Sequence, residues 1–238
     1  MKKIILTGCS RGIGKSILES LLQANYYVIG CSRDSNKDIE HLLSKHENFK
    51  YLSVDLSSDS ELEVLLKEFE NEEIYGLINN AGVGLDGILA TLPISDIEKL
   101  LSLNLKTPII LCRAMSRNII KNKKAGRIIN ISSIISERGY NGLSVYSSTK
   151  SGLNGLTISL ARELGRTGTT VNSILPGYIK TDMTNKLGES QISQILRRTP
   201  LGKLPDPEDI SSLVNYLLST EAKSITGQLI KVDGGISV

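Results

Sequence analysis

The sequence comprises 238 residues, of which 40% are hydrophobic and 22% charged, and its net charge is +3 at pH 7. This length suits one large α/β domain or two small ones, and so weak a positive charge does not indicate a nucleic-acid partner. The N-terminal stretch MKKIILTG is too short in apolar residues for a signal peptide, and no run approaches the roughly 18 residues of a membrane span. Three cysteines without a CxxC pair (Cys9, Cys31 and Cys112) favour a reducing cytoplasm and predict neither a disulfide framework nor a metal site.

Short apolar stretches alternate with longer amphipathic stretches along the whole chain. Several of the apolar stretches are continuous and rich in Ile and Val, which is typical of strands buried on both faces. This alternation predicts a single domain over residues 1–238, an α/β fold with a parallel sheet of about seven strands and helices on both faces. The predicted strands span residues 3–7, 26–31, 50–54, 74–79, 127–132, 170–175 and 229–232.

A glycine-rich stretch, LTGCSRGIG, follows the first predicted strand and opens the first predicted helix. It contains Gly8, Gly12 and Gly14. Glycines at a strand–helix turn let the backbone approach a phosphate, which then lies at the positive N-terminus of the helix. Such a stretch can also be a simple turn, but its position after the first strand favours dinucleotide binding.

The second predicted strand runs into Cys31, Ser32 and Arg33, with no carboxylate at its end. NAD sites usually carry an acidic residue there, which binds the ribose 2′-hydroxyl. We expect Asp34, one residue later, to point away from the site. Arg33, with Arg11 of the glycine-rich stretch, could bind a 2′-phosphate, so the sequence favours NADP(H). The alternative is that both arginines are ordinary exposed side chains.

Tyr146 and Lys150, in the stretch VYSSTKSG, are four residues apart and would share one face of a helix. The charge of the lysine would favour the phenolate and make Tyr146 a proton donor near neutral pH. In the alternative, the ring packs in the interior and the lysine extends past it to water. Only two histidines are present, His41 and His46, both in a polar helical segment, so a Ser-His-Asp hydrolase is hard to build.

Taken together, motifs along essentially the whole chain resemble the short-chain dehydrogenase/reductase family, in the subgroup similar to 3-oxoacyl-(acyl-carrier-protein) reductases. This resemblance implies a single-domain Rossmann-type doubly wound sheet. The motifs, in the order of the family, are TGCSRGIG, VDLS, NNAG, LSLNL, INISS, YSSTK, PGYIKTDM and GQLIKVDGG.

The resemblance implies a catalytic tetrad of Asn104, Ser133, Tyr146 and Lys150, with Ser132 as the alternative to Ser133. Asn104 would bend its helix and hold a water that links Lys150 to solvent. Hydride would pass from C4 of NADPH to a carbonyl carbon, while Ser133 and Tyr146 donate hydrogen bonds to the carbonyl oxygen. Tyr146 would deliver the proton, with its pKa lowered by Lys150 and by the charge of the oxidised nicotinamide, and no metal is required.

The resemblance also implies the contacts of an NADP(H) site. Asp55 would accept a hydrogen bond from the adenine amino group, or would instead cap the following helix. The NNAG stretch would line the cofactor, or would be a simple turn, and Ile179 and Thr181 would hold the nicotinamide carboxamide and a phosphate. The implied cofactor-binding residues are Gly8, Ser10, Arg11, Gly12, Ile13, Gly14, Ser32, Arg33, Asp55, Leu56, Asn79, Ala81, Gly82, Tyr146, Lys150, Pro176, Gly177, Ile179 and Thr181.

Residues 184–203 are predicted to form a substrate lid within the domain, with Ile192, Ile195 and Leu196 as an apolar wall and Arg197 and Arg198 facing an anionic group. By resemblance, basic side chains in two other regions could dock an acidic acyl carrier protein, or could simply be solvated. Thr167 lies where carrier-binding relatives commonly have a basic residue. The candidate docking residues are Lys121, Lys123, Lys124, Arg127, Arg162 and Arg166.

We therefore expect an NADPH-dependent reductase of 3-oxoacyl thioesters, bound to an acyl carrier protein or CoA, in fatty acid biosynthesis. One alternative keeps the chemistry but takes a sugar, a polyol, another secondary alcohol or ketone, or a ketoacyl intermediate of a specialised pathway. Another is a non-catalytic dinucleotide-binding or scaffold protein. The resemblance further implies a homotetramer, and no nucleic acid or membrane is expected as a partner.

Overall fold

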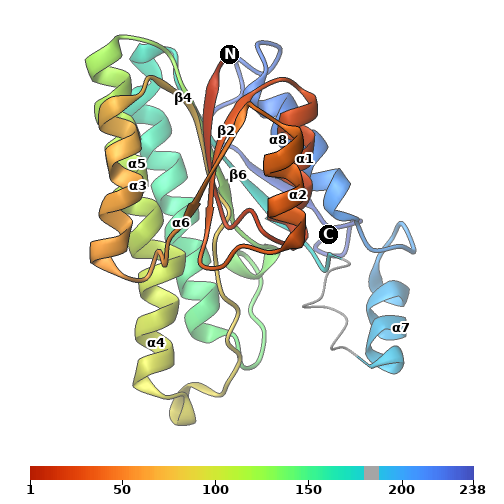
Figure 1. Cartoon of the computed structure of the whole chain (residues 1–238). Helices are drawn as coiled ribbons and strands as arrows, with labels where there is room; N and C mark the ends of the chain where they lie inside the picture. Colours follow the sequence, from red (N-terminus) through yellow and green to blue (C-terminus); the bar gives the residue numbers. More distant parts are fainter. Residues whose placement is uncertain (180–187) are drawn as a thin grey trace.

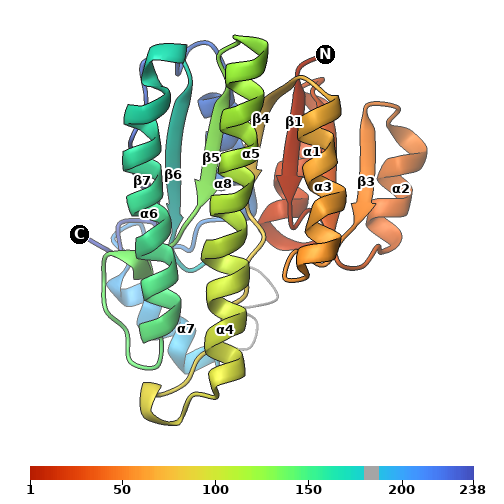
Figure 2. The same ribbon diagram turned by 90° about the vertical axis from the view of Figure 1, so that its left-hand side faces the viewer.

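A computed structural model describes residues 1–179 and 188–238. Its parallel strands form one sheet in the order β3-β2-β1-β4-β5-β6-β7 (Figures 1 and 2). The strand order reverses between β1 and β4, and in such sheets ligands bind in the crevice outside the carboxyl ends of the strands at that point. The strands are β1 (Lys3–Thr7), β2 (Tyr27–Ser32), β3 (Phe49–Ser53), β4 (Ile74–Asn79), β5 (Arg127–Ile131), β6 (Thr170–Pro176) and β7 (Leu229–Val232).

Helices cover both faces of the sheet, so the predicted doubly wound α/β fold is confirmed (Figure 1). One face is covered by α1 (Gly12–Gln23), α2 (Lys37–Lys45) and α8 (Pro207–Leu218). The other is covered by α3 (Asp59–Asn71), α5 (Thr107–Asn122) and α6 (Ser144–Leu164). The remaining helical segments are η1 (Leu89–Thr91), α4 (Ile94–Leu101), η2 (Ser102–Lys106), η3 (Ile134–Ser136), η4 (Gly165–Thr167) and α7 (Glu189–Arg198).

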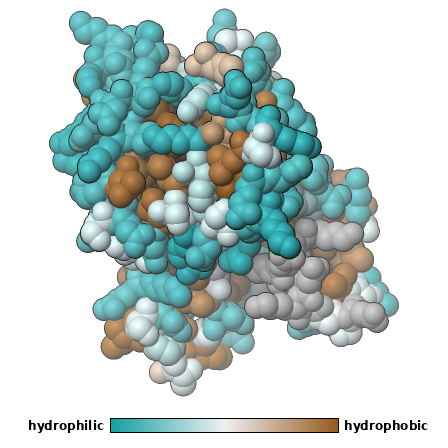
Figure 3. Space-filling view, viewed as in Figure 1, coloured by the Kyte–Doolittle hydropathy of each residue, from teal (hydrophilic) through white to brown (hydrophobic). Residues whose placement is uncertain are grey.

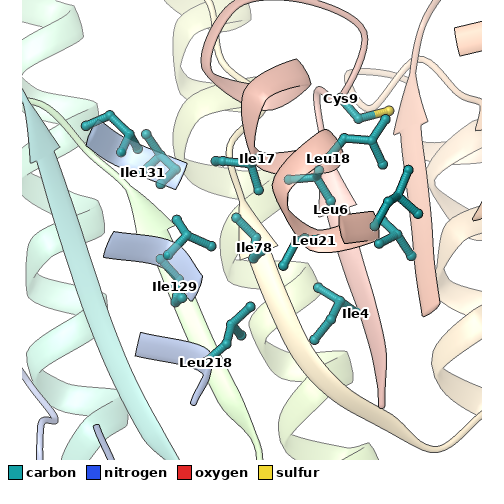
Figure 4. Packing of buried hydrophobic residues seen from close by; sticks show 14 of the residues in the cluster. Ile4, Leu6, Cys9, Ile17, Leu18, Leu21, Ile78, Ile129, Ile131 and Leu218 are labelled. Carbon is teal, nitrogen blue, oxygen red and sulfur yellow. The ribbon is translucent and has the colours of Figure 1, made fainter. Parts of the chain in front are cut away.

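The two cores follow from the alternation of side chains along each strand. In β1, Ile4 and Leu6 point to the face of α1 and α8, whereas Ile5 points to the face of α3 and α5. Figure 4 shows Ile4 and Leu6 packed with Ile17 and Leu21 of α1. Because every residue of β1 except Lys3 is buried, this strand reads as a continuous apolar run in the sequence.

Four predicted strands differ from the observed strands by one residue at one or both ends, and one predicted helix is divided. Strand β2 begins one residue later than expected and β3 one residue earlier, because the pairing register places the buried Phe49 opposite Val28. The helix that was expected to bend at Asn104 is instead α4 followed by α5, joined by the π-helical turn η2. A π-turn inserts an extra residue per turn and often lies at a functional site.

Most of the surface visible in Figure 3 is hydrophilic. Hydrophobic side chains show in the middle of this view and again at its lower end, where η1 and the beginning of α4 lie and where Ile88, Leu89 and Ile94 are exposed. Among the described residues, no helix is both long and apolar enough to cross a bilayer.

Candidate active site

The glycine-rich loop joins β1 to α1 at the switch point of the sheet. Gly8 and Gly12 have φ angles of 70° and 54°, which favour glycine. A Cβ on Gly14 would lie 1.9 Å from the carbonyl oxygen of Gly8, so the first turn of α1 packs directly on the loop. The N-cap residue Arg11 forms no side-chain cap, and the first turn carries no acidic residue. This helix N-terminus therefore fits a phosphate group.

The NNAG turn after β4 is fixed to the glycine-rich loop by two side chains. The hydroxyl of Thr7 accepts hydrogen bonds from the backbone N–H groups of Asn80 and Ala81, each 3.0 Å long. The amide of Asn80 donates to the carbonyl oxygens of Thr7 and Gly8, at 3.0 and 2.9 Å. Asn80 and Thr7 are thus positioning residues that the sequence analysis missed, although a second asparagine beside Asn79 was the available signal.

Asn79, which the sequence analysis included among the cofactor contacts, directs its side chain into the interior. It is 3% exposed, and its Nδ2 donates to Oδ1 of Asn130 at 2.8 Å. Asn130 in turn donates to the hydroxyl of Thr157 on α6. The side chain of Asn79 therefore ties β4 to β5, and only its backbone could face a bound dinucleotide.

The loop after β2 lies beside the glycine-rich loop. The amide of Asn36 donates to the carbonyl oxygen of Ser10 at 2.8 Å, while its Oδ1 accepts from the N–H of Ile39 and caps α2. Arg11 and Arg33 are both exposed, and neither forms an ion pair within residues 1–179 and 188–238. Two unpaired guanidinium groups on neighbouring loops fit a phosphate monoester such as that of NADP(H).

Asp55 follows β3 and forms a local turn. Its Oδ1 accepts from the hydroxyl and the N–H of Ser57, at 2.6 and 2.9 Å. These bonds, with a smaller contribution from the nearby Arg33, lower the pKa of Asp55. The N-cap of α3 is Ser58, so the alternative in which Asp55 caps this helix is wrong. The adjoining Leu56 is buried, and its carbonyl oxygen accepts from Thr107.

Lys150 lies in the interior, on the first turns of α6. It is 5% exposed, and its Nζ donates to the carbonyl oxygen of Ile131 at 2.8 Å. The same Nζ lies 5.8 Å from the centroid of the Tyr146 ring. Burial lowers the pKa of Lys150 to about 8. Lys150 therefore stays mainly protonated at neutral pH, and its proton is more easily lost than that of an exposed lysine.

In the chain alone, Tyr146 does not have the lowered pKa that the sequence analysis expected. Burial raises the pKa of the phenol, and a hydrogen bond with Ser133 only partly opposes that effect. The reason is that Lys150 directs its ammonium group to Ile131, and not to the phenol oxygen.

Ser133, and not Ser132, is the serine that reaches Tyr146. Ser133 follows β5 and precedes η3, and its hydroxyl interacts with the phenol and lowers the pKa of Tyr146. The hydroxyl of Ser132 is instead directed to the carbonyl oxygen of Lys150, at 3.2 Å. Alternate residues of an extended segment point in opposite directions, which explains why adjacent serines have different roles.

Asn104 is fully buried in the π-turn η2. A Cβ added to Gly82 would lie 3.2 Å from its Oδ1 and 3.6 Å from Nζ of Lys150. Gly82, Asn104 and Lys150 therefore meet at one point, although they come from three segments far apart in the sequence. The side-chain oxygen and nitrogen of Asn104 both bind Val83, so the amide is held in a fixed orientation.

The segment after β6 completes the described part of the site. The N–H of Gly177 donates to the carbonyl oxygen of Val232 at 2.9 Å, and a Cβ on Gly177 would lie 2.7 Å from that of Asp233. Ile179 buries its side chain in the core under α1 and α8. Thr181 and residues 184–187 of the predicted lid lie outside the described residues.

One candidate carrier-docking residue is wrongly assigned. Arg127 is 5% exposed, its Nη1 donates to the carbonyl oxygen of Gly126, and its guanidinium group lies 5.7 Å from the centroid of the Tyr75 ring. It is buried because β5 begins at this residue between β4 and β6. Of the other candidates, Lys124 pairs with Glu73 at 2.8 Å.

Comparison with known proteins places the chain in a family. A family model described as enoyl-(acyl carrier protein) reductase matches residues 8–237. The 3-oxoacyl-(acyl-carrier-protein) reductase FabG of Vibrio cholerae is 37% identical over 239 residues, covering 99% of this chain and 97% of that protein. The chain belongs to the short-chain dehydrogenase/reductase family. The FabG of Escherichia coli K12 is 36% identical to this reductase-family member over 239 residues, with the same coverage.

Solved structures place this short-chain dehydrogenase/reductase among nicotinamide-dependent enzymes. It superposes on 4-hydroxyisoleucine dehydrogenase complexed with NADH with a TM-score of 0.94 at 29% identity, covering 99% of this chain and 98% of that one. A putative gluconate 5-dehydrogenase from Beutenbergia cavernae with bound NADP gives a TM-score of 0.93 at 25% identity, covering 99% and 96%. The protein is an oxidoreductase that acts on CH–OH or C=O groups with a nicotinamide cofactor.

Proposed function

We propose that this protein is an NADPH-dependent reductase that converts a 3-oxoacyl thioester to the 3-hydroxyacyl thioester. The observation that carries the proposal is the convergence of Ser133, Tyr146 and Lys150 in a chain that also has an uncapped N-terminus at α1 and whose FabG relatives match over 99% of its length. Residues 1–238 act as one domain in this proposal, and residues 184–203 act as a lid over the substrate.

Two hydroxyl groups act on the carbonyl oxygen of the substrate. Ser133 and Tyr146 donate hydrogen bonds to it and stabilise the negative charge that develops there. Tyr146 then delivers its proton to that oxygen. Bound NADPH supplies the hydride. Lys150, protonated at neutral pH, stabilises the phenolate that remains on Tyr146. Asn104 holds the π-turn against Lys150, where it can connect the lysine to solvent.

The choice of NADP(H) rests on the loop after β2. The two solved relatives bind NADH and NADP respectively, so the fold accommodates either cofactor. In this chain, the loop carries the exposed Arg33, and Arg11 lies on the neighbouring glycine-rich loop. These cations would pair with the 2′-phosphate that distinguishes NADP(H) from NAD(H). The three cysteines are free and buried, which suits the reducing cytoplasm expected from the sequence.

An acyl carrier protein is the proposed donor of the thioester. Among the described residues, the candidate basic side chains that are exposed and form no ion pair lie before β5 or at the end of α6. They are Lys121, Lys123, Arg162 and Arg166. Tyr146 lies at the other end of α6. A 21-residue helix is about 30 Å long, so a carrier docked at these cations would serve the site of a neighbouring copy in a homotetramer.

A second candidate function keeps the chemistry but takes a secondary alcohol that carries a carboxylate. The described solved relatives include dehydrogenases named for 4-hydroxyisoleucine and gluconate. The cavity beside Tyr146, described below, has a polar lining that would suit such a substrate.

The purified protein tests the proposal directly, with acetoacetyl-CoA as substrate and the oxidation of NADPH and NADH followed by absorbance. We expect turnover with a preference for NADPH of tenfold or more, which Arg33→Ala removes while the matched control Arg117→Ala, on α5, retains it. NADPH binding without turnover would contradict the thioester substrate. Equal rates with both cofactors would contradict the assignment of Arg33.

A further inference from the structure

A cavity of about 190 Å³ lies between α7 and the rest of the molecule. Figures 1 and 2 show α7 beyond the carboxyl ends of the strands, at the same end of the sheet as the start of α6. The lining residues come from the segments after β5, β6 and β7 and from α7. They are Tyr140, Tyr178, Gln191, Gln194, Ile195, Arg198 and Ile236.

One face of α7 lines this cavity. Gln191, Gln194, Ile195 and Arg198 are spaced by three or four residues, so they lie along a single stripe of the helix. Arg197 is rotated by about 100° from Arg198 and is not part of the lining. The sequence analysis treated the two arginines alike, but the helix separates them.

The opposite wall is uncharged. The rings of Tyr140 and Tyr178 pack edge to face, with centroids 6.5 Å apart. Burial and a hydrogen bond between the two phenols raise the pKa of Tyr178 to about 12, so it stays neutral at physiological pH. Arg198 is thus the one charged side chain among the described lining residues, and it has no ion-pair partner within residues 1–179 and 188–238.

The cavity adjoins the candidate active site. Tyr140, Tyr178 and Ile195 pack against the same small apolar cluster as Tyr146, and that cluster includes Ile236 of the cavity wall. A substrate whose carbonyl oxygen meets Tyr146 can therefore extend into the cavity and reach Arg198 with its remote end.

We propose that Arg198 is a specificity-determining residue, which binds an anionic oxygen group at the end of the substrate remote from the reacting carbonyl. The inference rests on the reductase function proposed above. A guanidinium group offers several N–H donors in a planar fork that matches a phosphate or a carboxylate, and the side-chain amides of Gln191 and Gln194 add further donors. The shared chemistry is the oxyanion, and its source is either a phosphate of a pantetheine-bearing thioester or a substrate carboxylate.

Two pairs of substrates separate these sources. Acetoacetyl-CoA carries phosphates that acetoacetyl-N-acetylcysteamine lacks, and levulinate carries a carboxylate that its methyl ester lacks. We expect Arg198→Gln to raise KM about tenfold for the anionic member of one pair, the loss typical of a charged hydrogen bond, and to leave the neutral member unchanged. Arg197→Gln, the matched control on the same turn, should change neither. An effect confined to acetoacetyl-CoA identifies a phosphate, and one confined to levulinate identifies a carboxylate.

Equal effects of Arg198→Gln on the charged and neutral members of both pairs would overturn the proposal, as would equal effects of the two arginine variants. If the wild-type protein reduces none of the four compounds, the proposed function is wrong. Calorimetry then tests Arg198 without turnover, by titrating CoA and succinate into wild type and Arg198→Gln with NADP⁺ present. Identical affinities of the two proteins for both anions would overturn the assignment of Arg198.

Discussion

The side chain of Asn104 pairs with both backbone polar groups of Val83. Its Oδ1 accepts from the N–H of Val83 at 2.9 Å, and its Nδ2 donates to the carbonyl oxygen at 2.8 Å. This single amide therefore joins the π-turn η2 to the segment that follows the NNAG turn. Because a Cβ on Gly82 would contact both this amide and Nζ of Lys150, the pairing holds Asn104 at the point where these three residues meet.

Replacement of Asn104 by alanine would leave both backbone groups of Val83 without these partners. We expect Asn104→Ala to lower the free energy of unfolding by about 1–3 kcal/mol and to reduce turnover more than cofactor affinity. Denaturant titration, steady-state kinetics and NADPH titration measure the three quantities. The control is Asn122→Ala, which removes two hydrogen bonds to Asn118 within α5 and should have a smaller effect. Unchanged turnover in Asn104→Ala would show that the pairing has no role in positioning Lys150.

Tyr146→Phe removes the proposed proton donor but keeps the ring that packs against Leu175 and its neighbours. We expect turnover to fall by about 10²–10⁴, the usual contribution of a positioned acid, with little change in the affinity for NADPH. Single-turnover kinetics and a fluorescence titration of NADPH check the two expectations. Tyr216→Phe, at a phenol 45% exposed on α8, should behave as wild type. Retained turnover in Tyr146→Phe would refute the mechanism.

The lowered pKa of Lys150 makes the stability of the cofactor-free protein depend on pH. Burial lowers this pKa from 10.5 to about 8, so between these values the unfolded chain binds more protons than the folded one. The penalty for burying the charge is complete below about pH 8 and is relieved as the pH rises toward 10. We therefore expect wild type to gain stability relative to Lys150→Met over this range, by the order of 2 kcal/mol. Urea titrations of both proteins at a series of pH values measure the difference, and a gap independent of pH would contradict the buried, protonated lysine.

Two glycine-to-alanine changes should have opposite effects. In Gly14→Ala, the new Cβ would lie 1.9 Å from the carbonyl oxygen of Gly8, so α1 must move away from the loop. We expect a loss of several kcal/mol in stability and of NADPH binding. A Cβ at Gly165 would meet no atom within 4 Å, and its φ and ψ of −55° and −38° are helical. Gly165→Ala should therefore stabilise the protein by about 0.5–1 kcal/mol, as measured by thermal and denaturant unfolding. A tolerated Gly14→Ala would contradict the close contact.

Much of the fold could be predicted because its signals are local. Strand β1 is an apolar run followed by a glycine-rich turn, and its predicted bounds coincide with Lys3–Thr7. The π-turn at Asn104 was harder to predict. It depends on the hydrogen bonds of Asn104 to the distant Val83, and not on the residues beside it in the sequence. A buried asparagine in an apolar helix was nevertheless a correct sign of an unusual turn.

The errors concern the environment of charged and polar groups, which a sequence does not specify. Arg127 is part of a basic stretch, but the flanking strands of the sheet enclose it. Tyr146 and Lys150 share a helix face, yet the ammonium group is directed to Ile131, so the pKa of the phenol is not lowered in the chain alone. The role of Asn80 depends on Thr7, which lies 73 residues away. Only the packed structure brings such groups together.

The separation of two loops at the switch point has an evolutionary consequence. The glycine-rich loop is fixed internally by Thr7 and Asn80, whereas Arg33 extends from the end of β2, on a loop that meets the glycine-rich loop through the backbone of Ser10. On the proposed function, substitutions at Arg33 would alter which nicotinamide dinucleotide is preferred without rebuilding the glycine-rich loop. In evolution, the cofactor preference could then change between NADPH and NADH in a few mutations, and every intermediate protein would still fold.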